Sequence, residues 1–256
     1  MTKPRVLVVD VGGTHVKLLA SGRTSRREFV SGPEMTAAAM VAGVLKAANG
    51  WSFDVVSMGY PGPVLRGRPA AEPHNLAPGW VGFDFATGFG RPVRIINDAA
   101  MQALGSYKGG GNMLFLGLGA GLGSAMIVGG IVAPMELGHL PYRKKTFEHS
   151  VGLRGLDRLG KKKWRRCVDD AVARLIAALQ PDDVVLGGGN IHHLRALPKG
   201  CRAGDNANAF KGGFRMWDDA RNTPAGTRTP GASAFPTFEM QKKALGANGA
   251  SKPKRK

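Results

Sequence analysis

Residues 5–20 read RVLVVDVGGTHVKLLA, and this stretch decides the fold of the first part of the chain. Residues 5–10 form an apolar run rich in β-branched side chains, which Gly12 and Gly13 close. Residues 15–20 then return to an alternating pattern. The pattern predicts two antiparallel strands joined by a glycine turn, with no helix after the first strand.

A second unit of the same kind is expected at residues 113–128, where an apolar run is followed by LGAGLGS at residues 118–124. This is not a dinucleotide-binding loop, because a strand rather than a helix follows the glycines. Residues 155–161 spell GxxxxGK, but Lys162 stands where Ser or Thr is required and no strand precedes them. We therefore reject a P-loop.

Both glycine turns are candidate phosphate-binding loops. Glycine lets backbone N–H groups approach phosphate oxygens, Thr14 adds a hydroxyl donor, and Asp10 at the strand end can hold Mg²⁺ through water. The competing interpretation is a tight turn that binds nothing. Two such turns facing each other would grip a phosphate chain from both sides.

The remaining pattern alternates short apolar runs with helical spacing, which is typical of an α/β protein. Strands are predicted at residues 54–60, 93–97 and 183–187, and helices at 36–48, 99–107 and 161–180. We expect an N-terminal α/β lobe over residues 1–106 and a C-terminal α/β lobe over 107–218. Residues 219–256, rich in Thr, Pro, Gly, Ala and Lys, predict a disordered basic tail.

Composition narrows the class of protein. The 256 residues contain no apolar run of about 18 residues and no signal-peptide pattern, so we expect a cytoplasmic protein without a membrane partner. The two cysteines, Cys167 and Cys201, form no zinc-binding spacing.

The formal net charge is +18, and most of it lies in two segments. Residues 143–166 carry ten Lys/Arg against two acids, and residues 242–256 carry six against none. Such runs are commonly solvated faces or tails. The functional interpretation is a polyanionic partner, which could be nucleic acid, an acidic membrane or a long phosphate polymer.

Polar residues at two further places carry candidate chemistry. Asp98 follows Asn97 at the end of a predicted strand, where a carboxylate can accept a hydroxyl proton or the pair can simply cap a helix. Glu136, His139 and Glu148 are groups that bind vicinal sugar hydroxyls. Metal ligation by His139 and His149 is the weaker alternative, since no cysteine lies nearby.

Seven motifs in order resemble the ROK sugar-kinase family, and particularly its polyphosphate glucokinase branch. They cover roughly residues 5–217 and read DVGGTHVK, EPHNLAPGW, IINDAA, LGLGAGLGSA, ELGHLPYR, VVLGGGN and GDNANAFKGGFR. The resemblance implies a two-lobed actin-like ATPase or sugar-kinase fold of the ribonuclease H-like type, usually as a homodimer.

The resemblance also implies residue roles. Asp98 would be the catalytic base, and the hexose would be held by Asn75, Asn97, Glu136, His139 and Glu148. The donor phosphates would be held by Asp10, Gly12, Gly13, Thr14, Lys17, Gly119, Ala120 and Gly121, and the distal end of the donor by Gly188, Gly189 and Asn190. Most ROK kinases carry a cysteine-rich zinc segment after the Gly-His pair, and residues 140–150 contain no cysteine, so no zinc is expected. The usual Thr of the second phosphate motif is Ala120 here, so one hydroxyl that could donate a hydrogen bond to a phosphate is absent.

The expected function is a glucokinase that transfers a phosphoryl group from polyphosphate or ATP, with Mg²⁺, to the 6-hydroxyl of glucose, and also of mannose. The alternative is a non-catalytic sugar-sensing or polyanion-binding relative with the same fold. A nucleic-acid partner is not expected, because Asp10 comes too early for a preceding helix-turn-helix. The intact Asp98 favours catalysis.

Overall fold

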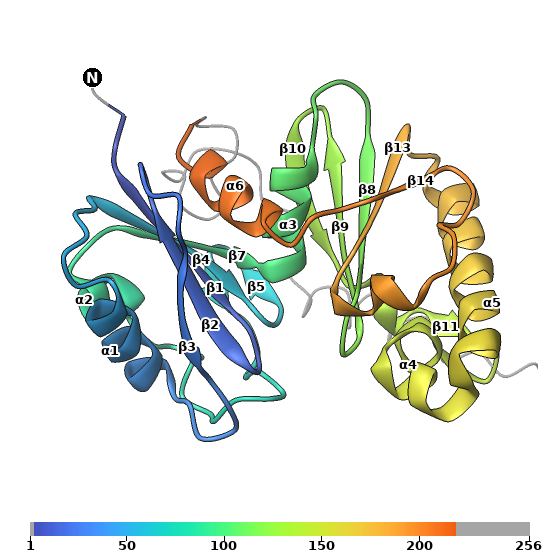
Figure 1. Ribbon diagram of the computed structural model, residues 1–256, viewed down its shortest axis with the longest axis horizontal. Helices are drawn as coiled ribbons and strands as arrows, with labels where there is room; N and C mark the ends of the chain where they lie inside the picture. Colours follow the sequence, from blue (N-terminus) through green and yellow to red (C-terminus); the bar gives the residue numbers. More distant parts are fainter. Residues whose placement is uncertain (1–2, 219–256) are drawn as a thin grey trace, which may run out of the picture.

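The computed structural model describes residues 3–218, so the prediction of a disordered tail over residues 219–256 lies outside the described part of the chain. The described residues form two β-sheets that follow one another along the chain, with helices between and outside them (Figure 1). The predicted boundary between residues 106 and 107 falls between the last helix of the first half and the first strand of the second, and the residue bounds of the two lobes stay a prediction.

The first sheet has the strand order β3-β2-β1-β4-β7. Its first three strands in sequence are antiparallel neighbours, and β4 and β7 add in parallel. The bounds are β1 (Val6–Val11), β2 (His15–Ala20), β3 (Arg27–Val30), β4 (Val55–Tyr60) and β7 (Val93–Asn97). The predicted hairpin at residues 5–20 is confirmed, with Val11 opposite Val16 at the turn.

The second sheet repeats this topology as β10-β9-β8-β13-β14. Again three antiparallel strands come first, and two parallel strands follow. The bounds are β8 (Met113–Leu118), β9 (Leu122–Val128), β10 (Ile131–Met135), β13 (Asp183–Gly187) and β14 (Cys201–Ala203). Two short hairpins lie outside the sheets, formed by β5 (Val64–Leu65) with β6 (Arg68–Pro69) and β11 (Pro141–Tyr142) with β12 (Lys145–Thr146).

Three layers of helices alternate with the two sheets (Figure 1). The first sheet is covered on its outer face by α1 (Ala37–Ala47) and α2 (Phe85–Phe89), and the second by α4 (Phe147–Val151) and α5 (Leu153–Leu179). Between the sheets lie α3 (Asp98–Ser106) and α6 (Asn208–Arg215), and two 3₁₀ turns, η1 (Leu137–His139) and η2 (Gly189–His193), complete the second half.

Successive side chains of a strand point to opposite faces of the sheet, which explains these layers. In β1, Leu7 and Val9 pack with α1, whereas Val6 and Val8 face the core that contains α3 and α6. The strand β8 divides its side chains in the same way between α5 and α3. Both faces of these central strands are therefore buried, which is why their sequences read as continuous apolar runs.

The helix predicted over residues 161–180 is confirmed as the second part of α5, residues 161–179. Gly160, with a backbone φ of 69° and ψ of 159°, separates it by a kink from a first helical part that begins at Leu153 and that the sequence did not predict. Within residues 3–218, no helix is both long enough and apolar enough to cross a membrane.

Candidate functional site

A cleft of about 330 Å³ lies where the two halves of the chain meet. It is lined by twelve of the residues that the sequence singled out, namely Gly12, Gly13, Asn75, Asn97, Asp98, Gly119, Ala120, Gly121, Glu136, His139, Glu148 and Gly188. The structure does not place Asp10, Thr14, Lys17, Gly189 or Asn190 on the cleft wall.

The first glycine turn packs directly against the loop that carries Asn75. The backbone N–H of Gly12 donates to the carbonyl of His15 at 3.0 Å, which closes the turn. A Cβ atom at Gly13 would lie 3.1 Å from the Cβ of Asn75, so a larger residue there would push this loop away. Small residues at the turn thus bring the backbone close to the cleft.

Asp10 lies behind this turn, next to Lys17 on the neighbouring strand. Burial raises the pKa of the Asp10 carboxyl, and the positive charge of Lys17 acts in the opposite direction. The carboxyl group keeps only limited contact with solvent. A cation beside it would offset the cost of burying its negative charge.

The second glycine turn is held from behind by the second half of the chain. The N–H of Leu153 donates to the carbonyls of Gly119 and Ala120 at 3.1 Å, and Asn190 Nδ2 donates to Gly119 O at 2.8 Å. Asn190 therefore braces the turn from behind the cleft wall. The exposed Ala120 side chain offers no hydroxyl, so this turn presents backbone groups only.

Asp98 is the first residue of α3 and directly follows β7. Burial raises the pKa of its carboxyl, and the nearby negative charge of Asp10 raises it further. A hydrogen bond of 2.7 Å from the backbone N–H of Ala99 lowers the pKa, and Glu136 raises it, with a net result of about 7. A carboxyl group with this pKa can take up and release a proton near neutral pH.

The residue before it, Asn97, is engaged in local structure. Its Oδ1 accepts hydrogen bonds from the N–H groups of Ala99 and Ala100 at 2.9 and 3.2 Å, and its Nδ2 donates to Gly62 O at 3.0 Å. Asn97 is thus the N-cap of α3, the local role that the sequence left open for this pair. Only the second N–H of its amide can serve the cleft.

Three further polar side chains come from the segment between β10 and α5. Burial raises the pKa of the Glu136 carboxyl, while His139 lowers it and Glu148 raises it. Ser124 holds the corner before η1, because its Oγ donates to Met135 O and accepts from the N–H of Leu137. A Cβ at Gly121 would lie 2.4 Å from Glu148 Oε2, so this carboxylate reaches the second glycine turn.

The cleft is also lined by residues to which the sequence analysis assigned no individual role, among them Leu122 and Gly123 of the second glycine turn. These are Pro61, Gly62, Pro63, Pro73, His74, Leu76, Ala99, Gln102, Phe115, Gly117, Leu122 and Gly123. Gln102 carried a usable signal, since it lies four residues after Asp98 and so on the same face of the helix. Gly123 packs close to Ala99, where a Cβ atom would lie 2.9 Å from the alanine methyl group, and this contact joins the second glycine turn to α3.

No group of three or more His, Cys, Asp or Glu side chains within residues 3–218 is arranged to hold a metal ion. A metal ion at this cleft would therefore be held by one or two carboxylates of the chain, together with water and oxygens of the substrate. Mg²⁺ binds in this way, because it retains several waters and takes the rest of its ligands from substrate phosphates. The buried Asp10 carboxyl beside the first glycine turn fits that requirement.

Comparisons with known proteins agree with the architecture. The sequence profile of the ROK family matches residues 6–152, more than half of the chain. The polyphosphate glucokinase of Mycobacterium tuberculosis (strain CDC 1551 / Oshkosh) is 28% identical over 204 residues, which cover 71% of this chain and 76% of that protein.

Two solved structures share the fold. The inorganic polyphosphate/ATP-glucomannokinase from Arthrobacter sp. strain KM superposes with a TM-score of 0.72 at 22% identity, covering 85% of this chain and 99% of that one. A ROK family glucokinase from Streptomyces griseus, solved with glucose and AMPPNP, gives a TM-score of 0.68 at 17% identity, with 84% and 99% covered. These likenesses confirm the predicted two-lobed actin-like sugar-kinase fold. The profile match over more than half of the chain shows that it belongs to the ROK family.

Proposed function

We propose that this chain is a sugar kinase, specifically a glucokinase that transfers a phosphoryl group from polyphosphate or ATP to the 6-hydroxyl of glucose, with mannose as a second acceptor. The observation that carries the proposal is the position of Asp98. Its carboxyl group, with a pKa of about 7, lines a cleft that both glycine turns also line. The polyphosphate glucokinase and glucokinase among its relatives support the same class of reaction.

In this reaction Asp98 accepts the proton of the sugar hydroxyl as its oxygen attacks the terminal phosphorus of the donor. A new oxygen–phosphorus bond forms while the bond from that phosphorus to the bridging oxygen breaks. The shortened donor leaves with the electron pair. Asp98 must be ionised to act as the base, and its pKa of about 7 keeps it sufficiently basic to take the proton.

The hexose side of the cleft is assigned to polar side chains from both halves of the chain. Glu136 and Glu148 would accept hydrogen bonds from sugar hydroxyls, and Asn75 and His139 would donate or accept. Asn97 would contribute one N–H and would mainly keep the start of α3, and hence Asp98, in place.

The donor phosphates are assigned to the two glycine turns, with backbone N–H groups of Gly12, Gly13, Gly119 and Gly121 as donors. Thr14 and Lys17 lie off the cleft wall and would act on the donor only from the rim. Asp10 would hold Mg²⁺ through water. When bound, Mg²⁺ neutralises negative charge on the donor oxygens during transfer.

The base role of Asp98 is tested with Asp98→Asn and, as a matched control, Asp169→Asn, which changes an exposed acid on α5. We expect Asp98→Asn to lose phosphorylation of glucose by at least about 10²-fold, the lower range of general-base contributions. Glucose binding, measured by calorimetry, should stay close to wild type. Turnover retained by Asp98→Asn would remove Asp98 from the base role.

Polyphosphate is proposed as a donor because exposed lysines lie near the distal donor loop. After the Gly160 kink, Lys161, Lys162 and Lys163 are exposed at the start of the second part of α5. Arg165 Nε donates to the carbonyl of His193 at 2.7 Å, so this part of α5 contacts η2, which begins at Gly189. An extended phosphate chain that passes Gly188 would reach these cations.

The donor assignment is tested by measuring glucose phosphorylation with polyphosphate and with ATP at low and high salt. Since salt screens exposed charges, the KM for polyphosphate should rise steeply with salt and in Lys162→Gln/Lys163→Gln, whereas the KM for ATP should change little. An absence of turnover with polyphosphate would refute this part of the proposal. Glucose binding without transfer from either donor would favour the sugar-sensing alternative.

A further inference from the structure

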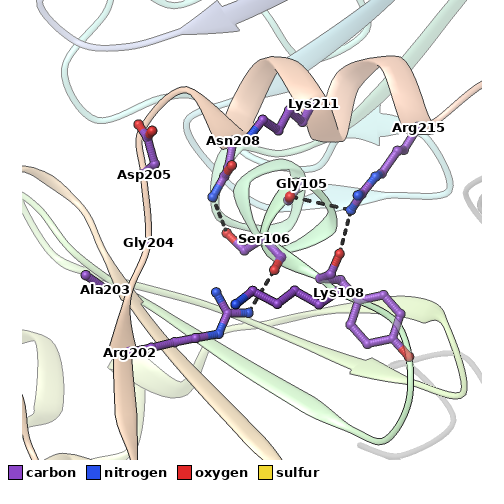
Figure 2. Close-up of a pocket in the computed structure, with 11 residues that line it drawn as sticks. Gly105, Ser106, Lys108, Arg202, Ala203, Gly204, Asp205, Asn208, Lys211 and Arg215 are labelled. Atoms are coloured by element: carbon purple, nitrogen blue, oxygen red, sulfur yellow. Dashed lines mark hydrogen bonds between the residues drawn. The ribbon is translucent and has the colours of Figure 1, made fainter.

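A second cavity, of about 510 Å³, lies at the other end of α3 from Asp98 (Figure 2). It is formed by the end of α3 and the residues after it, by β14 and the loop that follows, and by the polar side of α6. None of its lining residues lines the cleft. The full lining is Gly105, Ser106, Tyr107, Lys108, Arg202, Ala203, Gly204, Asp205, Asn208, Lys211 and Arg215. Its volume lies within the usual range for small-ligand sites, about 300–1,000 Å³.

Four of the lining side chains are cationic and one is acidic. Lys108, Arg202, Lys211 and Arg215 contribute positive charge, and Asp205 opposes it. Arg202 also pairs with Asp183, at 2.7 Å from its Nη2. With both acids counted, the cavity still has an excess of positive charge. Such a cavity favours an anionic ligand.

The two arginines are held in position by the end of α3. Arg215 Nη1 donates to Leu104 O at 2.6 Å and to Tyr107 O at 2.7 Å. Arg202 Nη2 donates to Ser106 O at 2.8 Å (Figure 2). These bonds satisfy carbonyl groups that the helix leaves open at its C-terminus. The guanidinium groups are therefore preorganised, and each has further N–H groups for a ligand.

Capping of α3 explains the two arginines, but it does not explain the two lysines. Lys108 and Lys211 are both exposed, and within residues 3–218 neither forms an ion pair. They come from opposite sides of the cavity, one after α3 and the other on α6, and both line it (Figure 2). Two lysines placed beside two fixed guanidinium groups match the oxygens of a phosphate group.

We propose that this cavity is a second ligand site, separate from the cleft, that binds a small anion through a phosphate group. Lys108 and Lys211 supply mobile charges, and Arg202 and Arg215 supply fixed N–H donors. The phosphate can belong to a short inorganic polyphosphate or to a phosphorylated hexose, since both present the same terminal group. A bound phosphate would bridge β14, α3 and α6.

The test measures binding of tripolyphosphate, glucose 6-phosphate and inorganic phosphate to the full chain by calorimetry. The variant is Lys108→Gln/Lys211→Gln, and the matched control is Arg23→Gln/Lys46→Gln, which removes two exposed charges from the first half of the chain. Thermal unfolding of each variant establishes that it is folded. We expect wild type and control to show a binding event, with at least one of the three anions, that weakens roughly tenfold or more in Lys108→Gln/Lys211→Gln, because two charge-assisted contacts are lost.

Comparison of the three anions identifies the source of the phosphate, and binding at the cleft is measured separately. Preference for tripolyphosphate assigns an inorganic chain, and preference for glucose 6-phosphate assigns a sugar phosphate. Binding at the cleft should persist in Lys108→Gln/Lys211→Gln, together with turnover of glucose. Equal binding by this variant and wild type, or no binding of any of the three anions outside the cleft, would overturn the second site. Neither result bears on Asp98 as the base.

Discussion

Asp98 should lower the stability of the native protein at high pH, and Asp98→Asn should remove that penalty. The fold raises the pKa of this carboxyl from 3.8 to about 7, first through burial and then through Asp10. Between these two values the native state binds a proton that the unfolded state has released. Stability therefore falls as the pH rises from about 4 to about 7, and stays reduced above 7.

The size of the effect follows from the shift. About three pKa units at 1.36 kcal/mol each correspond to about 4 kcal/mol of penalty above pH 7. Less than half of it is already present at pH 5, so the advantage of Asp98→Asn over wild type should grow by roughly 2–3 kcal/mol between pH 5 and pH 8.5.

Urea unfolding of wild type, Asp98→Asn and Asp169→Asn at these two pH values measures this difference. The control should differ from wild type by a similar amount at both, because Asp169 is exposed. An Asp98→Asn advantage that stays constant or shrinks toward pH 8.5 would refute the reasoning, since the carboxyl would then titrate as an ordinary surface acid.

Three further predictions concern the pH dependence of the reaction, the start of α3, and the contact between α3 and α6. The kcat/KM for glucose should fall about tenfold per pH unit below pH 7 and level off above it, because the base must be ionised; a profile that is flat from pH 5 to pH 8 contradicts this. Asn97→Ala should lower the free energy of unfolding by about 1–2 kcal/mol, measured in urea, because two N–H groups of α3 lose their acceptor. Gly105→Ala should lower the free energy of unfolding by about 2 kcal/mol or more, because its Cβ would lie 1.8 Å from Asn208 O. The control Gly189→Ala should lower it much less, because open space surrounds Gly189. Equal losses of stability would show that α3 and α6 separate easily.

Local sequence patterns predicted the elements that are long or strongly apolar. The hairpin of β1 and β2, the buried strands β4, β7, β8 and β13, and the helices α1 and α3 all lie within a residue or two of the predicted ranges. These segments have both a clear period and a clear stop signal. For α1, the stop is Asn49-Gly50, with Gly50 at a φ of 77°.

The elements that were missed lack such signals. Strands β3, β10 and β14 are short or exposed sheet edges, and their stability depends on pairing with a neighbour. Helix α6 contains Gly212 and Gly213, which lower its intrinsic helix propensity. Those glycines are needed by the tertiary structure, because a Cβ at Gly212 would lie 1.8 Å from Met101 O on α3 and one at Gly213 would lie 2.3 Å from Val8 Cγ1.

Local motifs in the sequence were sufficient to predict the fold class, the two glycine turns and half of the residues that line the cleft. The tertiary structure was needed to find the pKa of Asp98, the engagement of Asn97 in capping α3, and the position of Asn190 behind the second turn. It alone revealed the basic cavity around Lys108 and Lys211. Burial and electrostatic interaction depend on distances between residues far apart in the chain, and no local pattern contains those distances.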